Sequence, residues 1–394
     1  MEEYNGSMIQ RGIASFGLDD GHCPPWLFER MVKLGREMVY VLIAEYGPDE
    51  FIARIADPVW FQSLGTVLAF DWNASGLTTI LTAALKEAIR GHEREFGIAI
   101  CGGKGKTSRK TPEEITAWGE RMMISAPLAQ NLVYNSKMSA KVDSALVQDG
   151  FDLYHHAFLF SRNGAWAVVQ QGMNKDVRAA RRYHWYSKNI KDLVDEPHSG
   201  ISSAATLKTV LDLSAAKSDR TREISTALVQ HGYASLMKDV QLLRKHSSRL
   251  SQMATVRIGG DGRESRQLTL LNLESREFSH HPVMHENFSK SKYLEKVLAT
   301  VTDRRPDDYE SLVAIQGVGA KTVRALALIG EVIYGAAPSY EDPARYSVAH
   351  GGKDATPYPV DRRTYDESIA MLAAAVRKTR LPDVDKRKAI ARLV

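Results

Sequence analysis

The spacing of apolar residues predicts three helices near the start of the chain. From Trp26 to Tyr46 apolar positions recur at helical intervals, and Gly47-Pro48 is a normal stop for a helix. A second helix is expected over Asp49 to Ile55. A third is expected over Thr78 to His92, again from helical spacing of its apolar residues.

The pattern then changes to short runs typical of strands. Phe96 to Ile100 is a strand-like run of apolar residues. Two aromatic and β-branched runs between Phe158 and Val169 flank Asn163-Gly164, which is a strong signal for a tight β-turn. We therefore predict a β-hairpin there.

Helical spacing returns in the second half of the chain. The pattern is helical from Gly200 to about Leu250, Gly259 to Glu264 is a turn or loop, and Lys292 to Val394 is again helical. The predicted fold class is α/β, with a mixed α+β N-terminal part and a mainly α-helical C-terminal domain. We expect three domains. Residues 1–200 would hold any catalytic site, residues 201–290 would be a helical connecting region, and residues 291–394 would form the helical C-terminal domain.

Composition narrows the class of protein. A hydrophobic share of 44% and a charged share of 25% over 394 residues are those of a globular protein with more than one domain. Cys23 and Cys101 form neither a disulfide framework nor a zinc motif, and the longest apolar run, Met38 to Ala44, is too short to span a membrane. The acidic N-terminus is unlike a signal peptide. We expect a cytoplasmic protein without a membrane partner.

The net charge of +5 permits a polyanionic partner, and four cations cluster in one glycine-rich loop. This basic loop, Gly102 to Lys110, leads into a predicted helix start. There Thr111 would cap, Pro112 suits the first turn, and Glu114 would complete a capping box.

Two interpretations of the basic loop remain open, and a third is disfavoured. A nucleotide-binding P-loop needs a glycine five residues before Gly105, where Ile100 stands, so no nucleotide cofactor is expected. The loop either clamps a phosphate backbone or is a solvated, mobile segment. Its DNA-binding candidates are Lys104, Lys106, Arg109 and Lys110.

The most diagnostic motif lies between Leu312 and Leu328. An apolar helix, the sequence Gly-Val-Gly-Ala-Lys-Thr and a second apolar helix predict a sharp turn between two helices. Backbone N–H groups at the start of the second helix would meet a phosphate oxygen at the positive end of the helix dipole. The alternative is a tight turn that binds nothing. The residues expected at this contact are Gly317, Val318, Gly319, Lys321 and Thr322.

This motif resembles the helix-hairpin-helix of DNA repair enzymes, including the endonuclease III-like glycosylases. In that superfamily a Pro-Val-Asp segment after the hairpin supplies a catalytic aspartate, and bifunctional members also use a lysine inside the hairpin to form a Schiff base. Lys321 and Asp361 occupy the matching positions. An inserted segment, Ala336 to Tyr358, separates them, and Arg362-Arg363 replaces the usual Thr-His. The resemblance implies a glycosylase or abasic-site lyase.

A third group of residues suits phosphodiester hydrolysis. Such cleavage uses carboxylates that hold a metal, or a histidine that activates water. The catalytic candidates are Asp143, Asp149, His155 and His156, with Mg²⁺ or Mn²⁺ on Asp143 and Asp149. Adjacent residues of a strand point to opposite faces, so at most one of the two histidines is expected to face a site. The alternative is that all four are ordinary structural residues.

Nearly the whole chain resembles the family catalogued as domain of unknown function 763, a likeness that implies no particular activity. The similar stretches begin at Arg11, Trp26, Asp71, Gly102, Lys137, Tyr154, Val169, Arg181 and Glu196. They continue with the motif between Leu312 and Leu328 and with stretches that begin at Ala349 and Tyr358. Three functions remain open. The leading hypothesis is an enzyme of DNA repair or processing, most simply a nuclease. The alternatives are a glycosylase or lyase that uses Lys321 and Asp361, and a noncatalytic DNA-binding protein.

Overall fold

The computed structural model describes residues 22–68, 74–176, 178–203, 207–242, 292–344 and 362–391, and the chain divides into two compact units. Unit 1 comprises Met1–Ser144, Asp149–Val210 and Asp342–Val394, and unit 2 comprises Ala145–Gln148 and Leu211–Glu341. Both units are discontinuous, whereas the sequence pattern suggests three consecutive domains at 1–200, 201–290 and 291–394.

Unit 1 is built on an antiparallel sheet of five strands in the order β1-β3-β4-β5-β6. The predicted hairpin is confirmed: Asn163-Gly164 joins β3 to β4, and Gly164 adopts a φ of +92°. The strands are β1 (Ile98–Lys104), β3 (Asp152–Ser161), β4 (Trp166–Asn174), β5 (Ala179–Tyr186) and β6 (His198–Ser203).

Strand β1 lies later in the chain than the expected strand Phe96 to Ile100. Phe96 instead ends a short helix, α5 (Glu93–Phe96), and β1 continues through Gly102 and Gly103. These glycines adopt φ values of +82° and +144° while they pair with Ala157 and His156 of β3. Pairing with β3 therefore extends a strand that the glycines alone would have ended.

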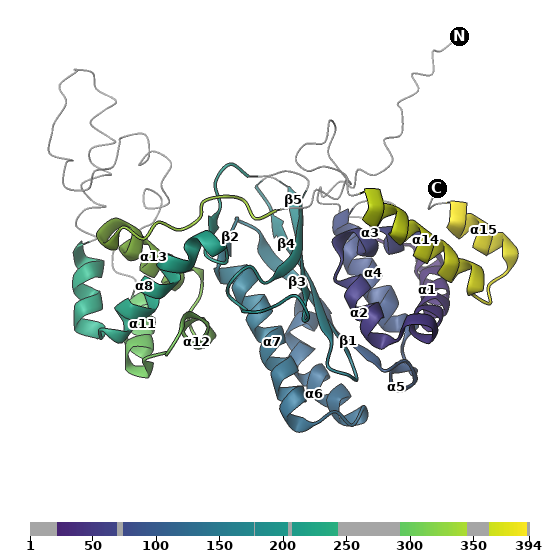
Figure 1. The fold of residues 1–394 in the computed structure, drawn as a ribbon, viewed down its shortest axis with the longest axis horizontal. Helices are drawn as coiled ribbons and strands as arrows, with labels where there is room; N and C mark the ends of the chain where they lie inside the picture. The colour runs from purple at the N-terminus through teal and green to yellow at the C-terminus, as the bar shows by residue number, and fades with distance from the viewer. Residues whose placement is uncertain are drawn as a thin grey trace, which may run out of the picture. The chain divides into compact units, whose positions relative to one another are not determined.

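One face of the sheet is covered by the helices α1–α4 and α14 (Figure 1). Trp60, Leu81 and Val376 from these helices share a core with Leu159 and Val169 of the sheet. The predicted helix from Trp26 is confirmed, with a stop at Gly47, where φ is +84°. The helices are α1 (Pro25–Tyr46), α2 (Pro48–Ile55), α3 (Pro58–Val67), α4 (Ala74–Ala88) and α14 (Arg362–Lys378).

The opposite face of the sheet is covered by α6 (Thr111–Arg121) and α7 (Ala126–Ala145), which the 3-10 turn η1 (Gly105–Lys110) precedes (Figure 1). The expected capping box is not formed. Thr111 is the first helical residue, and its hydroxyl donates to the Ser108 carbonyl at 2.6 Å. Glu114 instead accepts from the backbone N–H of Gly102 at 2.8 Å and pairs with Lys86 at 2.7 Å. It therefore fastens the base of the basic loop.

The last helices of the chain belong to unit 1 rather than to a separate C-terminal domain. Leu372 and Val376 of α14, and Ala389 of α15 (Asp383–Ala391), lie in the same apolar core as α1 and α3. Helical spacing predicts these helices, but it does not specify which surface they cover.

Unit 2 is mainly helical. Its helices include α8 (Asp219–Gln230), a helical stretch over 233–242, α11 (Lys292–Arg304), α12 (Tyr309–Ala314) and α13 (Ala320–Tyr334), together with the paired strands β2 (Val147–Gln148) and β7 (Leu211–Asp212) and the 3-10 turn η2 (Ala216–Ser218). The prediction of helix from Gly200 onward is wrong at its start. Strand β6 pairs with β5 and strand β7 pairs with β2, and helix begins only at Asp219. The loop expected at Gly259 to Glu264 lies outside the described residues. Among the helices that the structure describes, none is long and apolar enough to cross a membrane.

Candidate functional site

Buried polar side chains are concentrated at one end of the sheet in unit 1. The register places His155 beside Gln171 and Arg182, while His156 lies beside Gln170 in the neighbouring row. At the other end of the same strands the paired residues are apolar, such as Phe160 with Trp166. We call this region the polar sheet end and define it as His155, His156, Gln170, Gln171, Arg181 and Arg182.

The two candidate histidines lie on opposite faces of the sheet, as strand geometry predicts. His156 faces α7, where its Nε2 lies 2.9 Å from Ser136 Oγ and its Nδ1 lies 2.9 Å from Gln170 Oε1. His155 faces α4, and its Nε2 lies 3.2 Å from Thr82 Oγ1. Burial lowers the pKa of His155 to about 3 and also lowers the pKa of His156. Both rings are therefore neutral at neutral pH.

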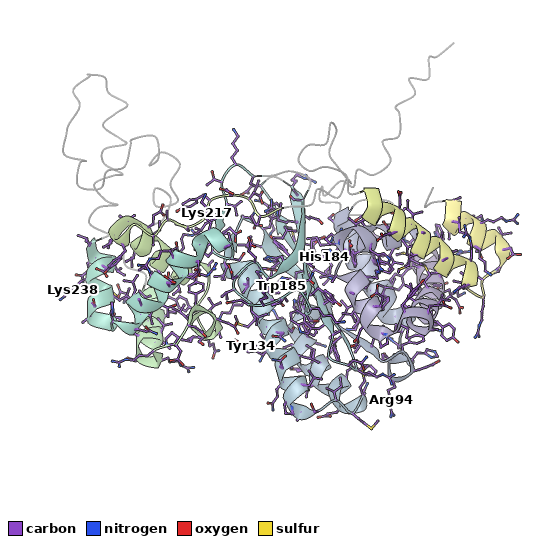
Figure 2. All side chains as sticks on the ribbon, in the orientation of Figure 1. Arg94, Tyr134, His184, Trp185, Lys217 and Lys238 are labelled. Atoms are coloured by element: carbon purple, nitrogen blue, oxygen red, sulfur yellow. The ribbon has the colours of Figure 1, made fainter. Side chains whose placement is uncertain are left out.

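Asp143 is enclosed by hydrogen-bond donors on the α7 face. Its Oδ2 accepts from Gln170 Nε2 at 2.5 Å and from Trp185 Nε1 at 3.1 Å, and its Oδ1 lies 2.5 Å from His198 Nε2. Trp185 faces α7, whereas the preceding His184 packs edge-on against Phe61 of α3, and both are labelled on β5 in Figure 2. Asp143 thus ties α7 to β4, β5 and β6.

Asp149 belongs to a different buried cluster. Its Oδ2 accepts from Arg181 Nη1 at 3.0 Å and from Tyr183 OH at 2.6 Å, and its Oδ1 accepts from the Phe151 N–H at 3.0 Å. Arg181 also makes a bidentate pair with Asp342, at 2.9 and 2.8 Å. Burial raises the pKa of Asp149 despite the opposing effect of Arg181. This cluster binds the segment at Asp342 to the sheet.

The four catalytic candidates are therefore not gathered around one accessible point. Each is at most 7% exposed, and His155 lies across the sheet from the other three. Among the described residues no group of three or more His, Cys, Asp or Glu side chains could hold a metal ion, so Asp143 and Asp149 do not form part of one. Their contacts are those of residues that hold the sheet and helices together.

The α4 face of the polar sheet end contains a chain of hydrogen bonds that reaches the surface. Gln171 Nε2 donates to Tyr154 OH and to the Ser75 carbonyl, and its Oε1 accepts from Thr78. Arg182 Nη1 donates to Thr78 Oγ1 at 3.3 Å. The half-buried Tyr154 lies at the outer end of this chain, with Lys104 Nζ 5.9 Å from its ring centroid.

Tyr154 and Gln171 were not candidates in the sequence. The register of β3 shifts between Leu153 and His155, so that Tyr154 is an extra residue in the strand. Such a β-bulge redirects side chains and follows from three-dimensional pairing rather than from residue type. The sequence therefore does not show in which direction the side chains of Tyr154 and Gln171 point.

The basic loop presents all four of its candidate cations to solvent. Lys104, Lys106, Arg109 and Lys110 are exposed, and the one described carboxylate that contacts the backbone of the loop is Glu114, already paired with Lys86. Cations therefore dominate this surface of unit 1.

In unit 2, α12 and α13 are joined by the short turn Ile315–Gly319. Asp308 caps α12 by accepting from the Ser311 N–H at 2.7 Å. Hydrogen bonds from the Ser311 side chain and, to a smaller extent, from its backbone N–H lower the pKa of Asp308. Gly317 adopts a φ of +94°, which favours glycine, whereas Gly319 is extended and its α-carbon has open space around it. Gly317 alone therefore needs to be glycine for the turn.

The start of α13 is open to solvent on one side. No side chain caps it, Lys321 at its second position is exposed, and Val318 and Thr322 are buried. Gln148 of β2 donates to the Ala320 carbonyl at 3.0 Å and accepts from Arg324, which fixes the helix start from the opposite side. Asp361, the other residue of the lyase hypothesis, lies outside the described residues.

Comparison with known proteins identifies a family. A family model described as "Protein of unknown function (DUF763)" matches residues 12–360, which is most of the chain. No curated protein and no solved structure shows a significant match.

Proposed function

The chain belongs to the DUF763 family, and we propose that it binds DNA through the sugar-phosphate backbone, with the α12–α13 turn as a helix-hairpin-helix. The observation that carries the proposal is the uncapped N-terminus of α13, which follows a glycine turn and has an exposed lysine at its second position.

The physical basis is the set of N–H groups at the start of a helix. The amides of Ala320 and Lys321 precede the first bonds of the helix, which the Thr322 and Val323 amides make to the Gly319 carbonyl. The dipole gives these first amides partial positive charge. Gly319 has no side chain to obstruct an approaching phosphate, and Lys321 adds a full charge. Contacts of this kind position a duplex without reading its sequence.

The basic loop of unit 1 supports the same partner independently. Four exposed cations within seven residues, Lys104 to Lys110, match the charge of a phosphate backbone. The proposal therefore has two cationic contacts, one in each unit.

Fluorescence anisotropy with a labelled duplex tests the hairpin contact. Lys321→Ala should weaken binding and reduce the slope of log K against log[salt] by about 1. Gly319→Val should weaken binding at unchanged stability, because the backbone there is extended and uncrowded. Lys296→Ala, an exposed lysine on α11 outside the turn, is the matched control. Equal binding and equal salt slopes for all four proteins would contradict the proposal.

What happens to the bound DNA is a separate proposal. Phosphodiester hydrolysis stays the leading proposal, by residues other than the buried Asp143, Asp149, His155 and His156, and the Lys321 lyase is its rival. Incubation of intact, nicked and abasic duplexes with Mg²⁺ or EDTA separates them. Metal-dependent cleavage of intact strands supports the nuclease. A borohydride-trapped adduct on abasic DNA that Lys321→Ala abolishes supports the lyase. Salt-sensitive binding with neither product leaves a noncatalytic DNA-binding protein.

A further inference from the structure

A bulge in β3 turns two consecutive residues toward the same face of the sheet. Leu153 pairs with Gly172 and His155 pairs with Gln171, so Tyr154 has no partner of its own in the ladder. Tyr154 contacts Gln171, which bonds to Thr78 of α4, while His155 contacts Thr82 of the same helix. Bulges are over-represented next to functional sites because they redirect a side chain in this way.

The hydrogen bonds behind Tyr154 fix which group donates. The Gln171 amide nitrogen donates to the Ser75 carbonyl at 2.8 Å, and its carbonyl oxygen accepts from the Thr78 hydroxyl. The opposite orientation would place two carbonyl oxygens together, so Nε2 must be the atom that faces Tyr154. The phenol oxygen is thus an acceptor from Gln171, and its O–H is left to donate in another direction.

The charge next to this phenol is positive. Burial raises the pKa of Tyr154, which keeps the O–H protonated at neutral pH. His155 is neutral because its pKa is lowered to about 3, mainly by burial and to a smaller extent by His156 and the charge of Lys104. Lys104 is exposed, pairs with His155 across β1 and β3, and has its Nζ 5.9 Å from the Tyr154 ring centroid. A phenol O–H on a ring that lies next to an ammonium group suits an anionic oxygen.

We propose that Tyr154 and Lys104 form a phosphate-binding subsite, in which Tyr154 donates its phenol hydrogen to a phosphate oxygen and Lys104 supplies the charge. Gln171 is the positioning residue that holds the phenol. The inference deepens the proposed function, because the other cations of the basic loop continue this surface and a DNA backbone presents phosphates in series. A free phosphate-bearing molecule has the same chemistry.

Two measurements distinguish these sources of phosphate. The first is anisotropy with a labelled duplex, and the second is the thermal midpoint in inorganic phosphate compared with chloride at equal ionic strength. Tyr154→Phe keeps the ring and removes only the O–H, and Lys104→Ala removes the charge. Tyr134→Phe and Lys188→Ala change an exposed tyrosine on α7 and an exposed lysine of unit 1, and serve as controls.

If the phosphate is that of DNA, Tyr154→Phe should weaken duplex binding roughly tenfold, the usual effect of losing a hydrogen bond to a charged group. Lys104→Ala should also reduce the salt slope by about 1. Both variants should lose part of the stabilisation by inorganic phosphate, and the controls should lose none. Loss of that stabilisation with unchanged duplex binding would assign the subsite to a small phosphate-bearing ligand.

The result that overturns the subsite is wild-type behaviour of Tyr154→Phe and Lys104→Ala in both measurements. This outcome is distinct from failure of the proposed function. If the wild-type protein binds no duplex, DNA binding through the hairpin is wrong, and the comparison in phosphate still decides the subsite. If only the Lys321 and Gly319 variants lose duplex binding, and Tyr154→Phe and Lys104→Ala keep the wild-type response to inorganic phosphate, the hairpin stands and the subsite falls.

Discussion

Replacing Arg181 with methionine tests whether the buried Asp149 serves the fold or a reaction. The Arg181 side chain is 0% exposed, and its guanidinium lies between the side chains of Asp149 and Asp342, which are 1% and 3% exposed. Methionine retains most of the apolar volume, so packing changes little. The main effect is that two buried carboxylates lose their shared cation.

The expected loss is large because removing one partner leaves an uncompensated buried charge. Breaking a buried ion pair in this way costs about 3–5 kcal/mol. For a unit of this size, that loss corresponds to a fall in melting temperature of roughly 6–20 °C. The total stability of a domain is only about 5–15 kcal/mol, so the variant should be close to the limit of folding.

Urea denaturation followed by circular dichroism measures the effect. Arg90→Met is the matched control, because Arg90 pairs with Glu87 on the surface at 70% and 38% exposure. Such a surface pair is worth about 0–1 kcal/mol. Equal stabilities for Arg181→Met and Arg90→Met would refute the structural role. If Asp149→Ala is also as stable as Arg90→Met but no longer cleaves DNA, Asp149 would again be a catalytic candidate.

Three further predictions concern stability. The folded-state pKa of His155 is about 3, whereas its unfolded value is about 6.5. Its contribution to stability is therefore complete above pH 6.5 and falls by about 1.4 kcal/mol per pH unit as the pH drops towards 3. His155→Gln should flatten a plot of unfolding free energy against pH, and an unchanged slope would contradict this. Gly317→Ala should cost about 1–2 kcal/mol because of the φ of +94°, measured by urea denaturation and absent if the turn tolerates a side chain. Asp57→Ala should cost about 1 kcal/mol, because Asp57 accepts from the N–H groups of Val59 and Trp60 at the start of α3; a thermal midpoint equal to that of the wild type would show that this cap is dispensable.

Local chemistry explains which parts of the fold could be predicted from the sequence. Asn163-Gly164 specifies its turn through the residues themselves, and Gly47-Pro48 ends α1 for the same reason. The start of unit 2 depends instead on partners that are distant in sequence. Leu211 pairs with Gln148, and Ile201 pairs with Tyr183, so a segment with helical spacing becomes strand. Such pairing has no local signal.

The candidate site was harder to predict, because residue type does not report burial. Asp143, Asp149 and His156 have side chains that suit catalysis, yet each makes hydrogen bonds inside the fold. The strand period did predict that His155 and His156 would face apart. It could not predict the bulge at Tyr154, which depends on how β3 pairs with β4.

The packing of α14 in unit 1 has a consequence for synthesis of the chain. Unit 2 ends at Glu341, whereas the core of unit 1 is closed by Leu372 and Val376. A ribosome therefore completes unit 2 before unit 1 has all of its core, and the surface later covered by α14 stays exposed while the intervening residues are made. The contacts that join α14 to α1 and α3 also close a loop of hundreds of residues, which is entropically costly and slow to find. Assembly of unit 1 is thus a late, chain-length-dependent event, and a nascent chain stalled before α14 would be a natural client for chaperones.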